Sequence, residues 1–172
     1  MRIYFDHNAT TPVEPSVAET MSSALVSTFG NPSSVHHFGQ QAKKLIDEAR
    51  TAVAELLGAR PSEVVFTSGG TESDNLAIRG VGELAATTNH RCHLITSAIE
   101  HDAVLKTVTT LGKRTGWRCT ILPVNKEGLV SPKQLADVID DETSIVSVMH
   151  ANNEIGTIQP IRELAAITHS RG

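Results

Sequence analysis

The segment HLITSAIEHDAVLKTVTTLGK, residues 93–113, holds the pattern that decides the fold. Its first five residues, 93–97, are a candidate strand, and residues 103–113 predict a helix. Residues 117–122 predict another strand directly afterwards. A strand, a helix and a second strand in this order are typical of a parallel sheet that is covered by helices.

Further strands and helices are predicted on both sides of this segment. Candidate strands occupy residues 64–67 and 144–149, and candidate helices occupy residues 16–27, 34–57, 75–86 and 131–139. A last helix is predicted to begin at Pro160-Ile161 and to end at Ser170-Arg171-Gly172. We therefore expect an α/β fold, with a mostly parallel sheet and helices on both of its faces.

The composition is that of a globular protein without membrane or nucleic-acid signals. The chain has 172 residues, of which 40% are hydrophobic and 20% are charged, enough for a domain with a core. Its net charge of −4 and isoelectric point near 6.0 give no electrostatic reason to expect nucleic-acid binding. No apolar run is long enough for a membrane span, and no signal-peptide pattern opens the chain, so we expect a cytoplasmic protein.

The residues after each predicted strand are the first candidates for a site, because ligands of open α/β sheets bind beyond the carboxyl ends of the strands. The turn Ser68-Gly69-Gly70-Thr71 follows one strand and opens a helix. Glycines in such a turn and unpaired N–H groups at a helix N-terminus bind phosphate, and Thr71 can add a hydroxyl. The alternative is a strand-to-helix turn that merely needs glycine.

Two other strand ends carry polar side chains. His101 follows the strand at 93–97, and an imidazole there can stack on a flat ring or move a proton near neutral pH. Asn152 and Asn153 follow the strand at 144–149, and one of these amides can hydrogen-bond a ligand oxygen. The alternatives are a histidine that caps a helix and an asparagine-rich turn.

The remaining histidines and the two cysteines have simpler interpretations. His36-His37 and the group His90, Cys92 and His93 lack a second half for metal binding, so we expect solvent-exposed histidines and no metal site. Cys119 lies in an apolar strand and is expected to be a buried small hydrophobe. Cys92 has no neighbour in the sequence that would clearly activate its thiol.

Taken in order, these motifs resemble the N-terminal part of the NifS/IscS cysteine desulfurases, in the class V aminotransferase group of fold-type I pyridoxal-phosphate (PLP) enzymes. The matching segments are FDHNATTP (5–12), FGNPSS (29–34) with His36 and Gly39, VFTSGGTESDN (65–75), Glu100-His101 and VMHANNEIG (148–156). The resemblance covers the whole chain. It implies an N-terminal arm and helix over residues 1–30 and an incomplete PLP-binding large domain over residues 31–172.

The resemblance also implies roles for single residues. Gly70 and Thr71 match the turn that holds the PLP phosphate. His101 matches the histidine that stacks on the pyridine ring and assists proton transfer, which would make it the catalytic residue of this part of the chain. Asn153 matches the asparagine that bonds the phenolic oxygen of the cofactor. Asn8, Ala9 and Thr10 match a segment on the substrate side, which is a weaker assignment.

In the family, sulfur passes from L-cysteine to a cysteine thiolate as a persulfide, alanine is released, and acceptor proteins take the sulfur for iron–sulfur clusters or thio-modification. The full-length enzymes are expected to be homodimers. The PLP-binding lysine and the nucleophilic cysteine of the family match positions beyond Gly172, and neither Cys92 nor Cys119 matches the nucleophile. We therefore expect this chain to be inactive alone, with exposed apolar surfaces.

Two other functions fit the same motifs. One is a fragment of another class V enzyme, such as a selenocysteine lyase or a small aminotransferase. The other is a non-catalytic protein that binds phosphate or a partner and has lost the chemistry. The segments Ala9-Thr10-Thr11-Pro12 and Asn152-Asn153-Glu154-Ile155-Gly156 favour the desulfurase.

Overall fold

The computed structural model describes residues 2–171 and contains two compact units, which meet in the chain between Phe66 and Thr67. The family resemblance implies a boundary after residue 30 instead, and that boundary stays a prediction. Met1 and Gly172 lie outside the described residues, and so does the predicted helix end at Gly172.

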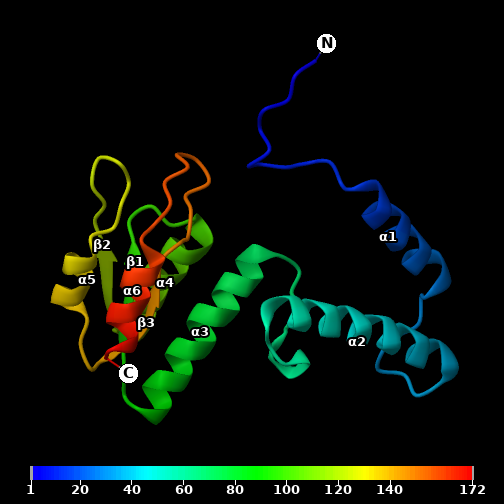
Figure 1. Ribbon diagram of the computed structural model, residues 1–172. Coiled ribbons are helices and arrows are strands. Elements are labelled where there is room, and N and C mark those ends of the chain that lie inside the picture. Colours follow the sequence, from blue (N-terminus) through cyan, green and yellow to red (C-terminus); the bar gives the residue numbers. More distant parts are fainter. Residues whose placement is uncertain (1, 172) are drawn as a thin grey trace. The chain divides into compact units, whose positions relative to one another are not determined.

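The first unit is helical. It contains α1 (Pro15–Ser27), α2 (His37–Leu57) and the 3-10 helix η1 (Pro61–Glu63), which are coloured blue to cyan in Figure 1. The predicted long helix begins later than expected, because His36 is its N-cap and accepts a hydrogen bond from the Gly39 backbone N–H at 3.3 Å. Gly58 ends this helix in a left-handed conformation with φ 64°, as glycine at this position predicts.

The prediction of a strand at residues 64–67 is wrong. The chain is extended there, but no strand among residues 2–171 pairs with it. The Arg50 guanidinium donates to the Val64 carbonyl and lies over the Phe66 ring, 5.0 Å from its centroid. A β-strand requires a hydrogen-bonded neighbour, and an apolar run alone cannot supply one.

The second unit contains the sheet. Three parallel strands, β1 (His93–Ser97), β2 (Arg118–Leu122) and β3 (Thr143–Ser147), lie in the order β2-β1-β3. Its helices are α3 (Gly70–Thr88), α4 (Asp102–Thr115), α5 (Pro132–Val138) and α6 (Ile161–His169). The predicted α/β fold is confirmed, with α3 beginning five residues before the predicted position of 75.

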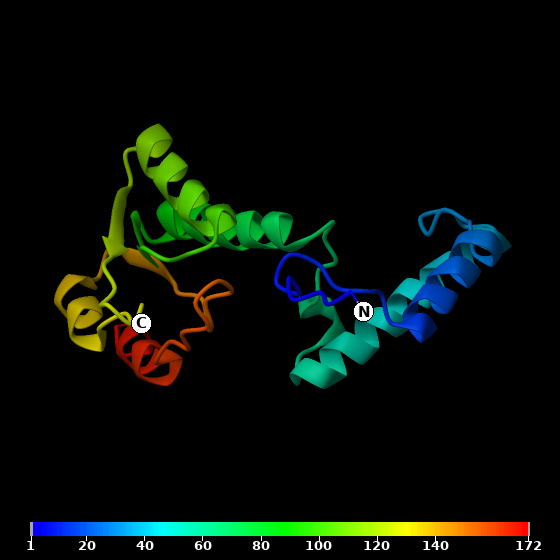
Figure 2. The same cartoon turned by 90° about the horizontal axis from the view of Figure 1, so that it is seen from above.

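Helices cover both faces of this sheet, as predicted. Leu94 of β1 packs with Ile78 and Val108 from α3 and α4, whereas the next residue, Ile95, packs with Leu135 and Leu164 from α5 and α6. Side chains of adjacent strand residues point to opposite faces, so β1 contributes to both cores. Figure 2 shows α3 and α4 on one side of the sheet and α5 and α6 on the other.

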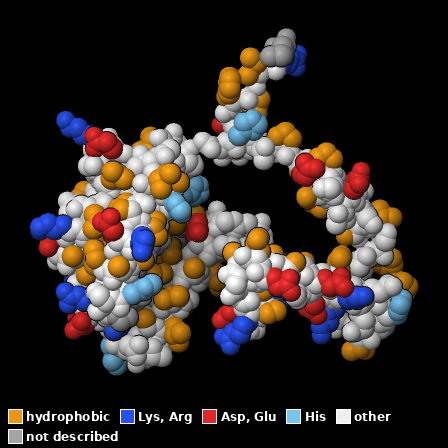
Figure 3. Space-filling model, in the orientation of Figure 1, with side chains coloured by type: hydrophobic (Ala, Val, Ile, Leu, Met, Phe, Trp, Pro, Cys, Tyr) orange, Lys and Arg blue, Asp and Glu red, His pale blue; other side chains and the backbone are white. Residues whose placement is uncertain are grey.

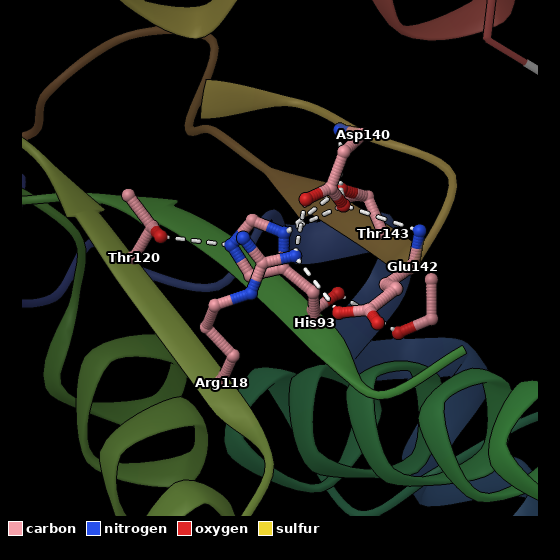
Figure 4. A network of polar contacts seen from close by, with 7 residues as sticks. His93, Arg118, Thr120, Asp140, Glu142 and Thr143 are labelled. Carbon is pink, nitrogen blue, oxygen red and sulfur yellow. Dashed lines mark hydrogen bonds and ion pairs between the residues drawn. The ribbon is translucent and has the colours of Figure 1, made fainter. Parts of the chain in front are cut away.

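His93, expected to be exposed, is fully buried at the start of β1. Its Nδ1 lies 2.9 Å from the Thr143 hydroxyl and 3.5 Å from Asp140 Oδ1, and its Nε2 lies 2.8 Å from the Thr120 hydroxyl. Figure 4 shows the ring between these groups. His93, the first residue of β1, therefore contacts Thr143 at the start of β3 and Thr120 in the middle of β2. The expectation of exposure was wrong because these partners come from distant parts of the sequence.

The charges around His93 set two pKa values. Burial lowers the pKa of His93, and the positive charge of Arg118 adds to this effect, against the opposing influence of Asp140 and Glu142. A hydrogen bond from Arg118 lowers the pKa of Asp140 to about 2. Asp140 is therefore ionised near neutral pH, while His93 is held in its neutral form.

Large apolar side chains are exposed in both units. In the first unit the largest exposed fractions include 85% for Leu56 and 93% for Val35, and in α3 they reach 51% for Leu76 and 64% for Leu84. Figure 3 shows such side chains in orange across the visible surface. Exposed apolar surface of this kind favours association in water, which is in line with the expectation from the sequence.

The His93 network predicts acid sensitivity of the fold. Because the folded pKa of His93 is below its unfolded value of about 6.5, the unfolded chain binds the proton first and the free energy of unfolding falls as pH drops below that value. The variant H93Q cannot titrate, so its unfolding free energy should change less between about pH 7.5 and about pH 5.5 in urea titrations. The matched variant H37Q, at an exposed histidine, should keep the parent pH dependence; equal dependence in H93Q and the parent would contradict the assignment.

Candidate functional site

A hollow of about 520 Å³ lies at the carboxyl edge of the sheet, in the second unit. It is lined by two segments that follow β1 and β3, namely Ile99, Glu100, His101, Asp102, Asn152, Asn153, Glu154 and Ile155. In Figure 1 the orange loop after β3 and the connection from β1 to α4 rise at the same edge. Two of the three predicted strand ends therefore meet in one site.

His101 forms one wall of the hollow and also begins α4. As N-cap residue, its Nδ1 accepts a hydrogen bond from the Ala103 backbone N–H at 3.1 Å. In the neutral imidazole the ring proton then belongs on Nε2, a tautomer inferred from this bond. The capping role does not compete with a role in the site, because it uses only one of the two ring nitrogens.

The two adjacent asparagines after β3 differ in their surroundings. Asn152 Nδ2 donates to the Ile99 carbonyl at 3.0 Å, and its Oδ1 accepts from the backbone N–H groups of Glu154 at 2.9 Å and Ile155 at 3.0 Å. Asn152 thus shapes the loop and fastens it to the end of β1. Asn153 is exposed on the wall of the hollow, where its amide can reach a ligand.

Glu100 is a residue of this site that sequence reasoning named only as the neighbour of His101. Its Oε1 accepts from the Ser97 hydroxyl at 2.6 Å and from the Met149 backbone N–H at 2.9 Å. Burial raises the pKa of the Glu100 carboxyl, and the negative charge of Asp74 in α3 acts in the same direction. The sequence feature that could have identified Glu100 is its position between an apolar strand and a helix. A carboxylate that is buried there needs hydrogen-bond partners.

The predicted phosphate turn begins α3 beside this site. Gly69 is the N-cap and Gly70 the first helical residue. The Glu72 carboxylate accepts from the Ser68 backbone N–H at 2.7 Å and from its hydroxyl at 2.6 Å. These bonds order the start of the helix.

Gly70 and Thr71 are exposed and are not among the described residues that line the hollow. A hydrogen bond of 2.8 Å from the Thr107 hydroxyl to Asn75 Oδ1 joins α3 to α4 in the second turn of each helix. The electrostatic influence of Asp74 on Glu100 likewise indicates that the first turn of α3 is near the hollow. A phosphate role for Gly70 and Thr71 stays a prediction.

The predicted substrate segment, Asn8, Ala9 and Thr10, belongs to the first unit. It forms an exposed turn in which the backbone N–H groups of Ala9 and Thr10 donate to the Asp6 carbonyl at 3.2 and 3.3 Å. The Tyr4 hydroxyl donates to the carbonyls of Asp6 and Thr10, at 2.8 and 3.1 Å. Its part in substrate binding stays a prediction.

The cysteines lie away from the hollow and are half-buried. The Cys119 thiol donates to the Val108 carbonyl at 3.3 Å, and burial raises its pKa, which disfavours the reactive thiolate. Within residues 2–171, no group of three or more His, Cys, Asp or Glu side chains is arranged to hold a metal ion. None of the helices described is both long and apolar enough to cross a membrane.

Comparison with known proteins defines the class to which this fold and site belong. The family Aminotransferase class-V matches residues 3–172, and the chain therefore belongs to that family. The chain is 48% identical over 165 residues to a cysteine desulfurase IscS of Dictyoglomus turgidum, covering 96% of this chain and 41% of the relative. It is 49% identical over 165 residues to a cysteine desulfurase IscS of Methanosarcina thermophila, covering 96% of this chain and 40% of the relative.

Solved structures agree with this membership. A NifS-like protein superimposes with a TM-score of 0.93 at 40% identity, over 100% of this chain and 46% of that chain. The apo cysteine desulfurase from Thermococcus onnurineus NA1 superimposes with a TM-score of 0.85 at 29% identity, over 99% of this chain and 42% of that chain. The chain thus spans less than half the length of these relatives.

The three hydrogen bonds of Asn152 predict graded effects of its substitution. N152A removes the bond to Ile99 and both bonds that order residues 154 and 155, and should lower the free energy of unfolding by about 1–3 kcal/mol. N152D keeps an acceptor for the N–H groups of residues 154 and 155 and removes only the donor to Ile99, so it should lower this free energy by less than N152A does. Urea titration of the two variants measures this difference, and equal losses would contradict the role assigned to the Oδ1 bonds.

Proposed function

We propose that this chain is the N-terminal portion of a PLP-dependent cysteine desulfurase, which converts L-cysteine to L-alanine and leaves sulfur as an enzyme-bound persulfide. The observation that carries the proposal is the hollow in which His101 after β1 faces the same space as Asn153 after β3. The family and the named relatives support the same reaction class.

The residues of the hollow, taken together with the start of α3, suit a phosphorylated pyridine. The volume of about 520 Å³ lies within the usual range for small-molecule sites. An imidazole and an amide line it, and the N-terminus of α3, an anion-binding element, is connected to α4 through Asn75 and Thr107. These are the three chemical groups that a flat ring, a ring oxygen and a phosphate require.

Each part of the site would then have its own role. His101 would stack on the ring, and its Nε2 would hold or move a proton, since Nδ1 already accepts from the Ala103 N–H. The Asn153 amide would donate to the phenolic oxygen, and the turn at Gly70 and Thr71 would bind the phosphate with backbone N–H groups. Bound PLP would supply an electron-withdrawing ring for the substrate.

The substrate and the partners follow from the same proposal. L-Cysteine is the sulfur donor, and sulfur-acceptor proteins take the persulfide for iron–sulfur cluster assembly or thio-modification. The full-length protein acts as a homodimer in the cytoplasm. The matching segment of the family gives Asn8, Ala9 and Thr10 a role in substrate binding.

Cofactor binding tests the site directly. In titrations of the purified chain with PLP, followed by absorbance and fluorescence, H101A and N153A should each raise the Kd by about tenfold or more, equivalent to ~1.4 kcal/mol. The exposed histidine variant H37A, in the first unit, should leave the Kd unchanged. Equal affinity of all four proteins would contradict the placement of the cofactor.

Catalysis by the chain alone is expected to be absent. The resemblance does not assign the family's lysine or its nucleophilic cysteine to any position of residues 1–172, so we expect this chain by itself neither to attach PLP covalently nor to accept sulfur. Purified chain incubated with PLP and L-cysteine should release no alanine above a protein-free control. Alanine release in proportion to the amount of chain would overturn this expectation.

A further inference from the structure

The two segments that line the hollow continue beyond the end of the strand ladder. The last pairing between β1 and β3 joins Thr96 to Ser147, and the Thr96 hydroxyl donates to the Ser147 carbonyl at 3.0 Å. Beyond this pair, no backbone pairing between the two segments within residues 2–171 sets their separation. His101 and Asn153 lie in this unpaired region.

Glu100 spans the gap between these segments. Its Oε1 accepts from the Ser97 hydroxyl at 2.6 Å and from the Met149 backbone N–H at 2.9 Å. We call this pair of bonds the Glu100 bridge. Farther along, Asn152 Nδ2 donates to the Ile99 carbonyl at 3.0 Å. His101 directly follows Glu100, and Asn153 directly follows Asn152. Each of these two residues that line the hollow is therefore adjacent to a residue whose side chain joins the two segments.

We propose that Glu100 is a positioning residue of the hollow, which fixes His101 and Asn153 against each other by accepting the Met149 N–H. The identity of the ligand, PLP, rests on the proposed function, whereas the bridge itself does not. Glu100 acts through its neighbours, because its hydrogen bonds go to Ser97 and Met149.

Glu100 holds the two segments together by accepting hydrogen bonds, and this role does not require its negative charge. Both bonds end on a single oxygen, Oε1, and a glutamine side chain offers one such oxygen at the same reach. Burial raises the pKa of Glu100, and Asp74 adds to this effect, while the bonds from Ser97 and Met149 oppose it without reversing it. Asp102 and Glu154, which line the same hollow, add further acidic groups to the site.

Two conservative variants separate these roles. E100Q keeps the reach and the acceptor but removes the charge, whereas E100D keeps the charge and shortens the side chain by one methylene. Hydrogen exchange of the Met149 backbone amide should accelerate by about tenfold or more in E100D and stay within about threefold of the parent in E100Q. The control E83A, at an exposed glutamate of α3, should behave as the parent.

Cofactor affinity should follow the same order. The Kd for PLP should rise by about fivefold or more in E100D and stay within about twofold of the parent in E100Q. Parent-like exchange and affinity in E100D, or losses in E100Q equal to those in E100D, would overturn the proposal. If the parent chain binds no PLP, the proposed function fails, while exchange at Met149 still decides whether the bridge exists.

Discussion

The second unit depends on the complete enclosure of β1. All five of its residues, His93 to Ser97, are buried, since β2 and β3 pair with both of its edges and helices cover both of its faces. A strand buried on four sides cannot shift along its neighbours without breaking both ladders and both cores. The positions of its two ends are therefore fixed, and the polar groups at those ends are fixed with them.

The polar groups at the two ends of β1 have different roles. At the amino end, His93 is joined to β3 and β2 through the hydroxyls of Thr143 and Thr120. Its hydrogen-bond partners are thus side chains of the sheet itself. At the carboxyl end, Glu100 and Asn152 join the segments that leave the sheet, and they leave an imidazole and an amide exposed to a hollow. The first network stabilises the sheet, and the second arranges the lining of the hollow.

Local patterns predicted most of the fold, and they failed where distant partners decide the outcome. The strand at 93–97 and its covering helices were predictable, because apolar patterning records burial on both faces. Residues 64–67 carry a similar apolar pattern but form no strand, because no strand among residues 2–171 pairs with them. The burial of His93 was missed because Thr120 and Thr143, 27 and 50 residues away, supply its bonds. The position of His101 and Asn153 in one hollow followed from the rule for strand ends, whereas the Glu100 bridge requires coordinates.

The central claim is that two strand ends and the start of α3 form one PLP site, and mapping of backbone amide shifts by NMR during a titration with PLP tests it most directly. The account predicts that shifts concentrate at residues 99–102, 152–155 and 69–72, with inorganic phosphate reproducing only those at 69–72. Shifts that concentrate at α5 and α6, or that leave residues 99–102 and 152–155 unmoved, would contradict it.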